Sequence, residues 1–284
     1  TGSALFEDIT GLPEYYPTRS EVALLTRHAR ELAAAIGPGR AVVELGSGSS
    51  TKTPLLLDAI APGAYVPVDI SGDFLRDSAA ALSARFPDLP VYPVEADFTQ
   101  PVALPREICG LPKLGFFPGS TIGNMVARSA VDLLRHWRGA LGDGALMLIG
   151  VDRIKDIGTL ERAYDDSAGV TAAFNLNLLE RINRELGGTI PVANFDHRAC
   201  WNDVHARIEM HLVAACDLDF IVDGRSYTMA KGETIHSENS HKYGPRDASL
   251  LLRAGGWTPI AVWDDVDPAF ALILAEATEV RAAP

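Results

Sequence analysis

A run of small residues, Pro-Gly-Ser-Thr-Ile-Gly-Asn at 118–124, follows directly on the apolar stretch 114–117. The apolar stretch is typical of a buried strand, and small residues let the backbone approach a bound molecule closely. Ligands of parallel α/β sheets bind at the carboxyl ends of the strands, where Asn124 would offer an amide donor and a carbonyl acceptor. An ordinary strand-to-helix turn explains the same residues equally well.

Three acidic residues accompany three further predicted strands. Glu44 precedes the turn Gly46-x-Gly48, Asp69 follows the next strand, and Asp97 follows a third. We expect them along one rim of the sheet, where a carboxylate can accept hydrogen bonds from ribose hydroxyls. Thr51 stands where a dinucleotide fingerprint has its third glycine. The acidic rim favours S-adenosylmethionine, which has a cationic sulfonium and no pyrophosphate, over a nicotinamide dinucleotide.

A carboxylate and a hydroxyl, Glu238 and Ser240, lie two residues apart in the stretch 233–243. On an extended strand both side chains point to one face. The carboxylate can accept from one N–H of an imidazole, and the hydroxyl can bond to the other ring nitrogen. An exposed strand edge would carry the same pair. His236 and His241 flank it without helical ligand spacing or a Cys-x-x-Cys motif, so we predict no metal site.

The elements that must position these residues alternate between strand and helix in the first half of the chain. A capping box at Thr18 and Glu21 predicts a helix over 22–36. Strands are predicted at 41–45, 65–68, 91–94, 114–117 and 145–151, and helices at 54–60, 73–86 and 127–140. This order predicts an α/β fold with a mostly parallel sheet.

After residue 151 the alternation stops. The pattern predicts a helical stretch over 159–187, then strands over 208–222 and 225–229 around a turn at Asp223-Gly224. The segment 245–275 reads as a helix followed by two strands, which we expect to return to the main sheet.

Composition narrows the class of protein. The 284 residues exceed a typical single domain, so two cores are expected. A net charge of −12 argues against nucleic acid as a partner, and no apolar run is long enough to span a membrane. Cys109, Cys200 and Cys216 are unclustered, which favours a reducing cytoplasm over a disulfide framework. We expect a monomer with a small-molecule substrate, and, because the chain begins at Thr1, an upstream segment that is missing.

Several motifs together resemble those of the histidine-specific S-adenosylmethionine methyltransferases. They are Leu12-Pro13-Glu14-Tyr15-Tyr16-Pro17-Thr18-Arg19, Glu44-Leu45-Gly46-Ser47-Gly48, Asp97-Phe98, the run Gly119 to Asn124, and Ala163-Tyr164-Asp165-Asp166. The resemblance runs from about Leu5 to Ala275. It implies a Rossmann-like class I methyltransferase sheet with a second, α+β substrate-binding domain. The cofactor domain would comprise 20–153 and 243–284, and the substrate domain 1–19 and 154–242.

The same resemblance implies roles for single residues. Gly46 and Lys52 would lie on the cofactor loop, Asp69 would hold the ribose, and Asp97 with Phe98 would surround the adenine. The substrate's backbone would be held by Tyr15, Gly119, Asn124 and Tyr164, and its ring by Met210, Glu238 and Ser240. Asn124, facing the amino group, and Tyr15 are the expected catalytic residues.

The activity implied is methylation of the α-amino nitrogen of histidine to the trimethyl betaine hercynine, a step of ergothioneine biosynthesis. The residues indicate no general base, because an asparagine cannot take a proton at neutral pH. A methyltransferase for another aromatic amino acid, a nicotinamide dehydrogenase and a non-catalytic S-adenosylmethionine-binding protein are the alternatives.

Overall fold

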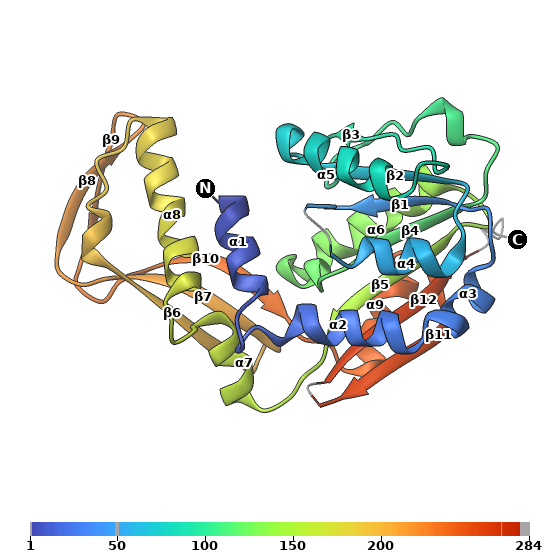
Figure 1. Cartoon of the computed structure of the whole chain (residues 1–284). Coiled ribbons are helices and arrows are strands. Elements are labelled where there is room, and N and C mark those ends of the chain that lie inside the picture. The colour runs from blue at the N-terminus through green and yellow to red at the C-terminus, as the bar shows by residue number, and fades with distance from the viewer. Residues whose placement is uncertain (1, 49–50, 268, 279–284) are drawn as a thin grey trace, which may run out of the picture. The chain divides into compact units, whose positions relative to one another are not determined.

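The computed structural model describes residues 2–48, 51–267 and 269–278. Within these ranges the chain forms two compact units. The larger unit comprises residues 17–153 and 243 onward, and the smaller unit comprises residues up to 16 together with 154–242 (Figure 1). The chain therefore passes from one unit to the other at three places, and each unit contains segments that are distant in sequence.

The larger unit is built on one seven-stranded sheet with the order β11-β12-β5-β4-β1-β2-β3. The strands β1 to β5 pair in parallel, whereas β12 is antiparallel to β5 and β11 is antiparallel to β12. Their bounds are β1 (Ala41–Leu45), β2 (Ala64–Asp69), β3 (Val94–Glu95), β4 (Lys113–Phe117), β5 (Leu146–Asp152), β11 (Trp257–Val266) and β12 (Ala269–Ala277). The sheet confirms the predicted α/β fold and the return of the last segment to it.

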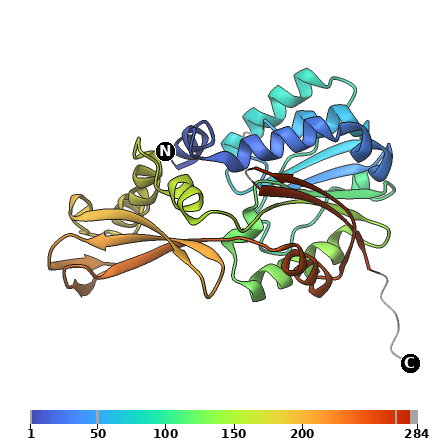
Figure 2. The same ribbon diagram turned by 90° about the horizontal axis from the view of Figure 1, so that it is seen from below.

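Helices cover both faces of this sheet (Figures 1 and 2). One apolar cluster joins the sheet to α6 (Ala127–Leu141) and α9 (Pro245–Ala254). The other joins it to α2 (Tyr16–Arg27), α3 (Ala29–Ile36), α4 (Thr53–Ile60) and the end of α5 (Gly72–Arg85). Because both faces are covered, β1 and β5 are buried along their whole length, and apolar residues occupy most of their positions.

The smaller unit carries a three-stranded antiparallel sheet with the order β10-β7-β6, and a separate hairpin of β8 and β9. Its strands are β6 (Phe195–Asn202), β7 (Arg207–Ala214), β8 (Leu218–Val222), β9 (Arg225–Met229) and β10 (Thr234–His241), and its helices are α1 (Gly2–Thr10), α7 (Ile157–Tyr164) and α8 (Val170–Leu186). Buried and half-exposed residues alternate strictly along β7. No helix in the described part of the chain is both long and apolar enough to cross a membrane.

Two helix predictions are wrong in their bounds. The helix α2 begins at Tyr16, so Thr18 and Glu21 lie inside it and form no capping box. Pro17 suits the first turn, where its missing N–H costs nothing. The helix predicted over 22–36 is divided at His28.

The helix predicted over 159–187 is also two helices. The Asp166 carboxylate accepts hydrogen bonds from the backbone N–H groups of Val170 at 3.0 Å and Thr171 at 2.7 Å. Because these bonds cap the start of α8, a separate helix begins there. Gly169, with φ +73°, makes the turn between the helices.

The strand predictions are wrong at three places. The stretch 208–222 breaks at 215–217 into β7 and β8, and β6 was not predicted. The strand expected at 91–94 is reduced to an isolated bridge at Val91 and the two-residue β3. Three short helical turns complete the elements: η1 (Arg106–Ile108), η2 (Thr121–Asn124) and η3 (Val192–Asn194).

Candidate functional site

The glycine-rich turn after β1 is held by the end of β2. The backbone N–H groups of Gly46 and Ser47 donate to the Val68 carbonyl at 2.9 and 3.2 Å. The Asp69 carboxylate accepts from Gly48 N at 3.0 Å and from Ser71 N at 2.8 Å. Asp69 therefore fixes the turn that it was predicted to accompany. Residues 49 and 50 of the predicted turn lie outside the described residues.

The ring of Phe98 lies against this turn. A Cβ on Gly46 would stand 3.2 Å from Phe98 Cε1, and the φ of +69° also favours glycine there. Trp137 Nε1 donates to the Phe98 carbonyl at 2.9 Å and holds the backbone in place. The Asp97 carboxylate accepts from the Thr99 hydroxyl and from Thr99 N, which keeps the pKa of Asp97 below its ordinary value. An ionised carboxylate thus follows β3, as Asp69 ends β2.

The prediction of three acids on the rim is wrong for Glu44. Its side chain is fully buried inside β1, where it accepts hydrogen bonds from the hydroxyls of Thr53 and Tyr65. Burial, together with the negative charge of Glu44, raises the pKa of Tyr65 well above its ordinary value. Glu44 therefore ties β1 to α4 and β2 from within the core.

Glu21 is a site residue that the sequence analysis missed. Its Oε2 lies 2.7 Å from Lys52 Nζ and accepts the Gly119 N–H at 2.8 Å. The carboxylate is fully buried, and its Oε1 has no hydrogen-bond partner among the described residues. The close approach of Oε1 leaves no room for a Cβ at Gly150. One carboxylate thus joins the predicted cofactor residue Lys52 to the predicted substrate loop.

That loop has a fixed backbone. Gly119 has φ +79° and Ser120 has φ +57°, two consecutive left-handed residues between β4 and η2. The buried Ser120 hydroxyl accepts the Asp152 N–H at 2.9 Å, which anchors the loop to β5. Asn124 ends η2 and is exposed.

The smaller unit brings together the other predicted substrate residues. Tyr15, Tyr164 and Met210 belong to one apolar cluster, and the rings of Tyr15 and Tyr164 meet edge to face with centroids 6.0 Å apart. Glu238 on β10 pairs with Met210 on β7, and Ser240 pairs with Ile208. The register therefore places Glu238 and Ser240 on the face of the sheet that carries Met210.

A buried lysine organises the hydroxyls on this face. Lys242, only 2% exposed, donates from Nζ to Tyr164 Oη and to Ser240 Oγ, both at 2.8 Å. The two hydroxyls also bond to each other at 2.8 Å. Lys242 was not predicted, although its spacing from Glu238 and Ser240 places all three on one face of a strand. Both hydroxyls accept from Lys242, and in the bond between them one donates and the other accepts, so Lys242 fixes the orientation of the pair.

Glu238 has an unusual carboxylate. Burial raises its pKa from 4.5 to about 7, and the positive charge of Lys242 lowers it only in part. Its side chain makes no hydrogen bond within the described ranges. A partly desolvated carboxylate that makes no hydrogen bond is stabilised by a ligand that donates to it.

We expect replacement of Lys242 by Met to raise the KM for the substrate of this face by roughly tenfold, because Tyr164 and Ser240 lose the donor that orients them. Affinity for the ligand of the larger unit should not change. Steady-state kinetics and calorimetry on the variant check this, with the exposed Lys231 changed to Met as the matched control. An equal loss of both affinities would contradict the assignment.

The predicted residues thus fall into two groups. The larger unit carries the predicted cofactor residues together with Gly119 and Asn124, and the smaller unit carries Tyr15, Tyr164, Met210, Glu238 and Ser240. Each group is locally ordered by one buried ionisable residue that the sequence did not reveal, Glu21 in the first and Lys242 in the second.

Known proteins resemble the chain over nearly its whole length. The family of histidine-specific, S-adenosylmethionine-dependent methyltransferases matches residues 1–277. The histidine N-alpha-methyltransferase of Mycolicibacterium smegmatis is 39% identical over 291 residues, which cover 96% of this chain and 86% of that protein. Ergothioneine biosynthesis protein 1 of Neurospora crassa is 31% identical over 278 residues, covering 92% of this chain and 30% of that protein.

Among solved structures, the 1,6-didemethyltoxoflavin-N1-methyltransferase of Burkholderia thailandensis has a TM-score of 0.53 at 11% identity, covering 98% of this chain and 88% of that one. At this identity the likeness shows the fold alone, that of a class I methyltransferase. The family match and the 39% identity show more than the fold. Together with the sheet order, they establish that the chain belongs to the histidine-specific, S-adenosylmethionine-dependent methyltransferases.

Proposed function

We propose that this protein transfers methyl groups from S-adenosylmethionine to the α-amino nitrogen of L-histidine, three times in succession, to give the betaine hercynine for ergothioneine biosynthesis. The observation that carries the proposal is the half-buried carboxylate of Glu238, which makes no side-chain hydrogen bond, beside the hydroxyl of Ser240 on one sheet face. A carboxylate and a hydroxyl together complement the two nitrogens of an imidazole. The names of the relatives in Mycolicibacterium and Neurospora agree with this reaction and pathway.

The larger unit would hold S-adenosylmethionine through Gly46, Lys52, Asp69, Asp97 and Phe98. The side chains present suit this cofactor. Two acidic residues stand at the ends of neighbouring strands, and an aromatic ring lies against the glycine-rich turn. The buried Ser47 hydroxyl has no hydrogen-bond partner among the described residues. When bound, this group supplies a methyl carbon attached to a positively charged sulfur.

The smaller unit would hold the amino acid, with Glu238, Ser240 and Met210 at the ring and Tyr15 and Tyr164 at the backbone. From the larger unit, Gly119 and Asn124 would complete the backbone contacts, with the Asn124 amide oxygen directing the amine. Asn124 cannot accept its proton at neutral pH, so the proton would leave to water. The protein's contribution would then be positioning, which suits a site made of hydrogen-bonding groups.

We expect a monomeric enzyme, and the net charge of −12 argues against a nucleic acid partner. We place the enzyme in the cytoplasm, because Cys109, Cys200 and Cys216 are all free. Light scattering after gel filtration tests the monomer.

The decisive assay incubates the protein with S-adenosylmethionine and, separately, histidine, tryptophan or tyrosine, and follows successive methyl additions by mass spectrometry. We expect mono-, di- and trimethylated histidine and no methylated tryptophan or tyrosine. If histidine stays unmodified while another amino acid is methylated, the proposed substrate is wrong. If cofactor binds and no product forms from any of them, the protein is a binding protein instead.

The pKa of Glu238 predicts how histidine use depends on pH. The protonated carboxyl is uncharged and accepts more weakly from the imidazole N–H, so kcat/KM for histidine should fall as pH drops below about 7. Free histidine titrates in the same range, so the measurement compares wild type with Glu238→Gln at each pH. We expect the ratio of their kcat/KM values to fall toward one at low pH; a ratio that stays constant would contradict the prediction.

The same pKa fixes the sign of the stability change. Because the folded-state pKa of Glu238 lies above its ordinary value of 4.5, folding favours the protonated form, and this stabilisation is complete at low pH. It is lost as pH rises through about 7. The Tm of the unliganded wild type should therefore fall relative to that of Glu238→Gln as the pH rises from 4.5, the ordinary pKa, to about 7, the pKa in the folded protein.

A further inference from the structure

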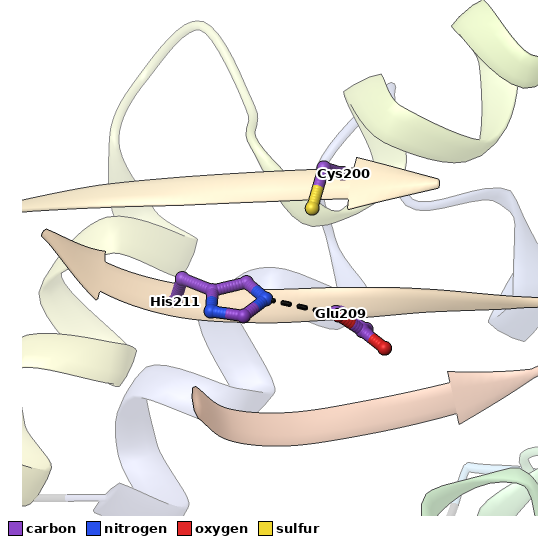
Figure 3. A group of neighbouring side chains, drawn as sticks. All are labelled: Cys200, Glu209 and His211. Atoms are coloured by element: carbon purple, nitrogen blue, oxygen red, sulfur yellow. Dashed lines mark hydrogen bonds and ion pairs between the residues drawn. The ribbon is translucent and has the colours of Figure 1, made fainter. Parts of the chain in front are cut away.

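Three side chains of different chemistry meet on the reverse face of the β10-β7-β6 sheet. Cys200 on β6 pairs directly with Glu209 on β7, and His211 follows two residues later on the same face (Figure 3). The thiol sulfur, one carboxylate oxygen and one imidazole nitrogen all lie within 4.8 Å of one another. All three residues are half-buried. A thiol, an imidazole and a carboxylate are the ligand types of zinc.

The neighbours of Glu209 and His211 orient both for a common ligand. Arg207 donates to Glu209 Oε1 from Nε at 2.8 Å and from Nη2 at 2.6 Å, and Asn202 Nδ2 donates to the same oxygen at 2.8 Å. The other oxygen, Oε2, is left facing His211 Nε2 at 3.1 Å. On the far side of the ring, His211 Nδ1 lies 3.3 Å from the Thr234 hydroxyl. Without a metal, Nε2 carries the proton that it donates to Glu209. If the ring proton moves to Nδ1 and is donated to Thr234, the lone pair of Nε2 becomes available to a metal.

A metal ion bound at Cys200 would be held by the thiolate, so the thiol proton would pass to solvent.

A fourth ligand position lies across the sheet. Asn239 on β10 pairs directly with Glu209, so its side chain is on the same face. Its Oδ1 is buried and has no hydrogen-bond partner in the described part of the chain. The His236 ring stacks on that of His211 with centroids 4.7 Å apart and covers it from the side of β10.

We propose that Cys200, Glu209 and His211 form a zinc site, with the Asn239 amide oxygen or a water molecule completing four-coordination. The prediction of no metal site considered only ligands close in sequence, whereas this set is assembled across strands. Met210, between Glu209 and His211, points to the opposite face, which carries Glu238 and Ser240. A bound ion would therefore be structural and would clamp β7 on both sides of Met210.

The test uses the full chain, stripped of metal with a chelator and then titrated with Zn²⁺ or Co²⁺. We expect roughly one ion per chain after dialysis, and, with Co²⁺, a near-ultraviolet thiolate-to-cobalt absorption band with the visible intensity of four-coordination. Added Zn²⁺ should raise the Tm. Mass spectrometry of the metal content and absorption spectroscopy measure both without reference to catalysis.

Cys200→Ser should abolish the charge-transfer band and lower zinc retention by roughly tenfold or more, and His211→Gln should lower it similarly. Cys216→Ser, at an exposed cysteine, is the matched control and should retain ion and band. Circular dichroism establishes that each variant is folded. A band that survives Cys200→Ser, or a wild type that retains no zinc, overturns the proposal.

Discussion

Replacement of Glu21 by Gln is expected to lower kcat/KM by roughly a hundredfold, because this carboxylate holds both Lys52 and the Gly119 loop. The ion pair is almost wholly buried, with side-chain exposures of 13% for Lys52 and 0% for Glu21. Removing one partner leaves the other charge buried and unpaired, which should also cost about 3 kcal/mol of folding free energy. Kinetics and chemical denaturation measure these two effects, and calorimetry with S-adenosylmethionine measures the affinity for the cofactor.

A positioning role and a purely structural role for Glu21 can be separated. Replacing Glu21 and Lys52 together by Leu and Met removes the unpaired charge and should restore most of the stability, but not cofactor affinity. Glu185→Gln is the matched control, since that carboxylate forms exposed ion pairs with Arg181 and Arg184 whose loss should leave stability and activity nearly unchanged. Recovery of full activity in the double variant would contradict the positioning role.

Replacement of Glu238 by Ala should lower kcat/KM for histidine by a similar factor, without weakening the binding of S-adenosylmethionine. A hydrogen bond to a charged acceptor contributes up to about 3 kcal/mol, so kcat/KM for histidine should fall by roughly a hundredfold. The affinity for S-adenosylmethionine should stay within about twofold of wild type, because Glu238 belongs to the smaller unit. Kinetics over a range of histidine concentrations and calorimetry with the cofactor give the two numbers.

Stability provides an independent check on this variant. At pH 8 the wild-type protein keeps a half-buried carboxylate ionised without a hydrogen-bond donor, so Glu238→Ala should unfold at a Tm no lower than wild type despite its loss of activity. The exposed Glu233 just before β10, changed to Ala, is the matched control and should leave histidine use unaltered. A large drop in Tm with Glu238→Ala, together with lost cofactor binding, would mean that the residue is structural.

The sheet of the larger unit could be predicted because its strands carry long apolar runs with turn residues between them. β1 and β5 are buried on both faces, and burial of this kind leaves a clear trace in the sequence. β6 left no such trace, because only one of its faces is buried and charged residues such as Asp196 and Arg198 interrupt it. The split between α7 and α8 depends on Asp166, whose carboxylate could equally have pointed to solvent.

The candidate site was predictable where a residue's role lies in its own type and local spacing, as for the pair Glu238 and Ser240. Glu21 and Lys242 escaped because their partners, Lys52 and Gly119 for the first and Tyr164 for the second, are distant in the sequence. Glu44 was misjudged for the same reason. Its position at the end of a strand is visible in the sequence, but the two hydroxyls that bind it in the core are not.

The alternation of β7 also bears on how the protein can change during evolution. Ile208, Met210 and Leu212 face the substrate residues and the core, and Arg207, Glu209 and His211 face the other way. Neighbouring residues of β7 are therefore under different selection pressures. A substitution that changes substrate preference on one face need not affect Arg207, Glu209 and His211 on the other. A single-residue insertion would exchange the two sets at once, so this strand can accept a substitution on one face without affecting the other, but hardly any change in length.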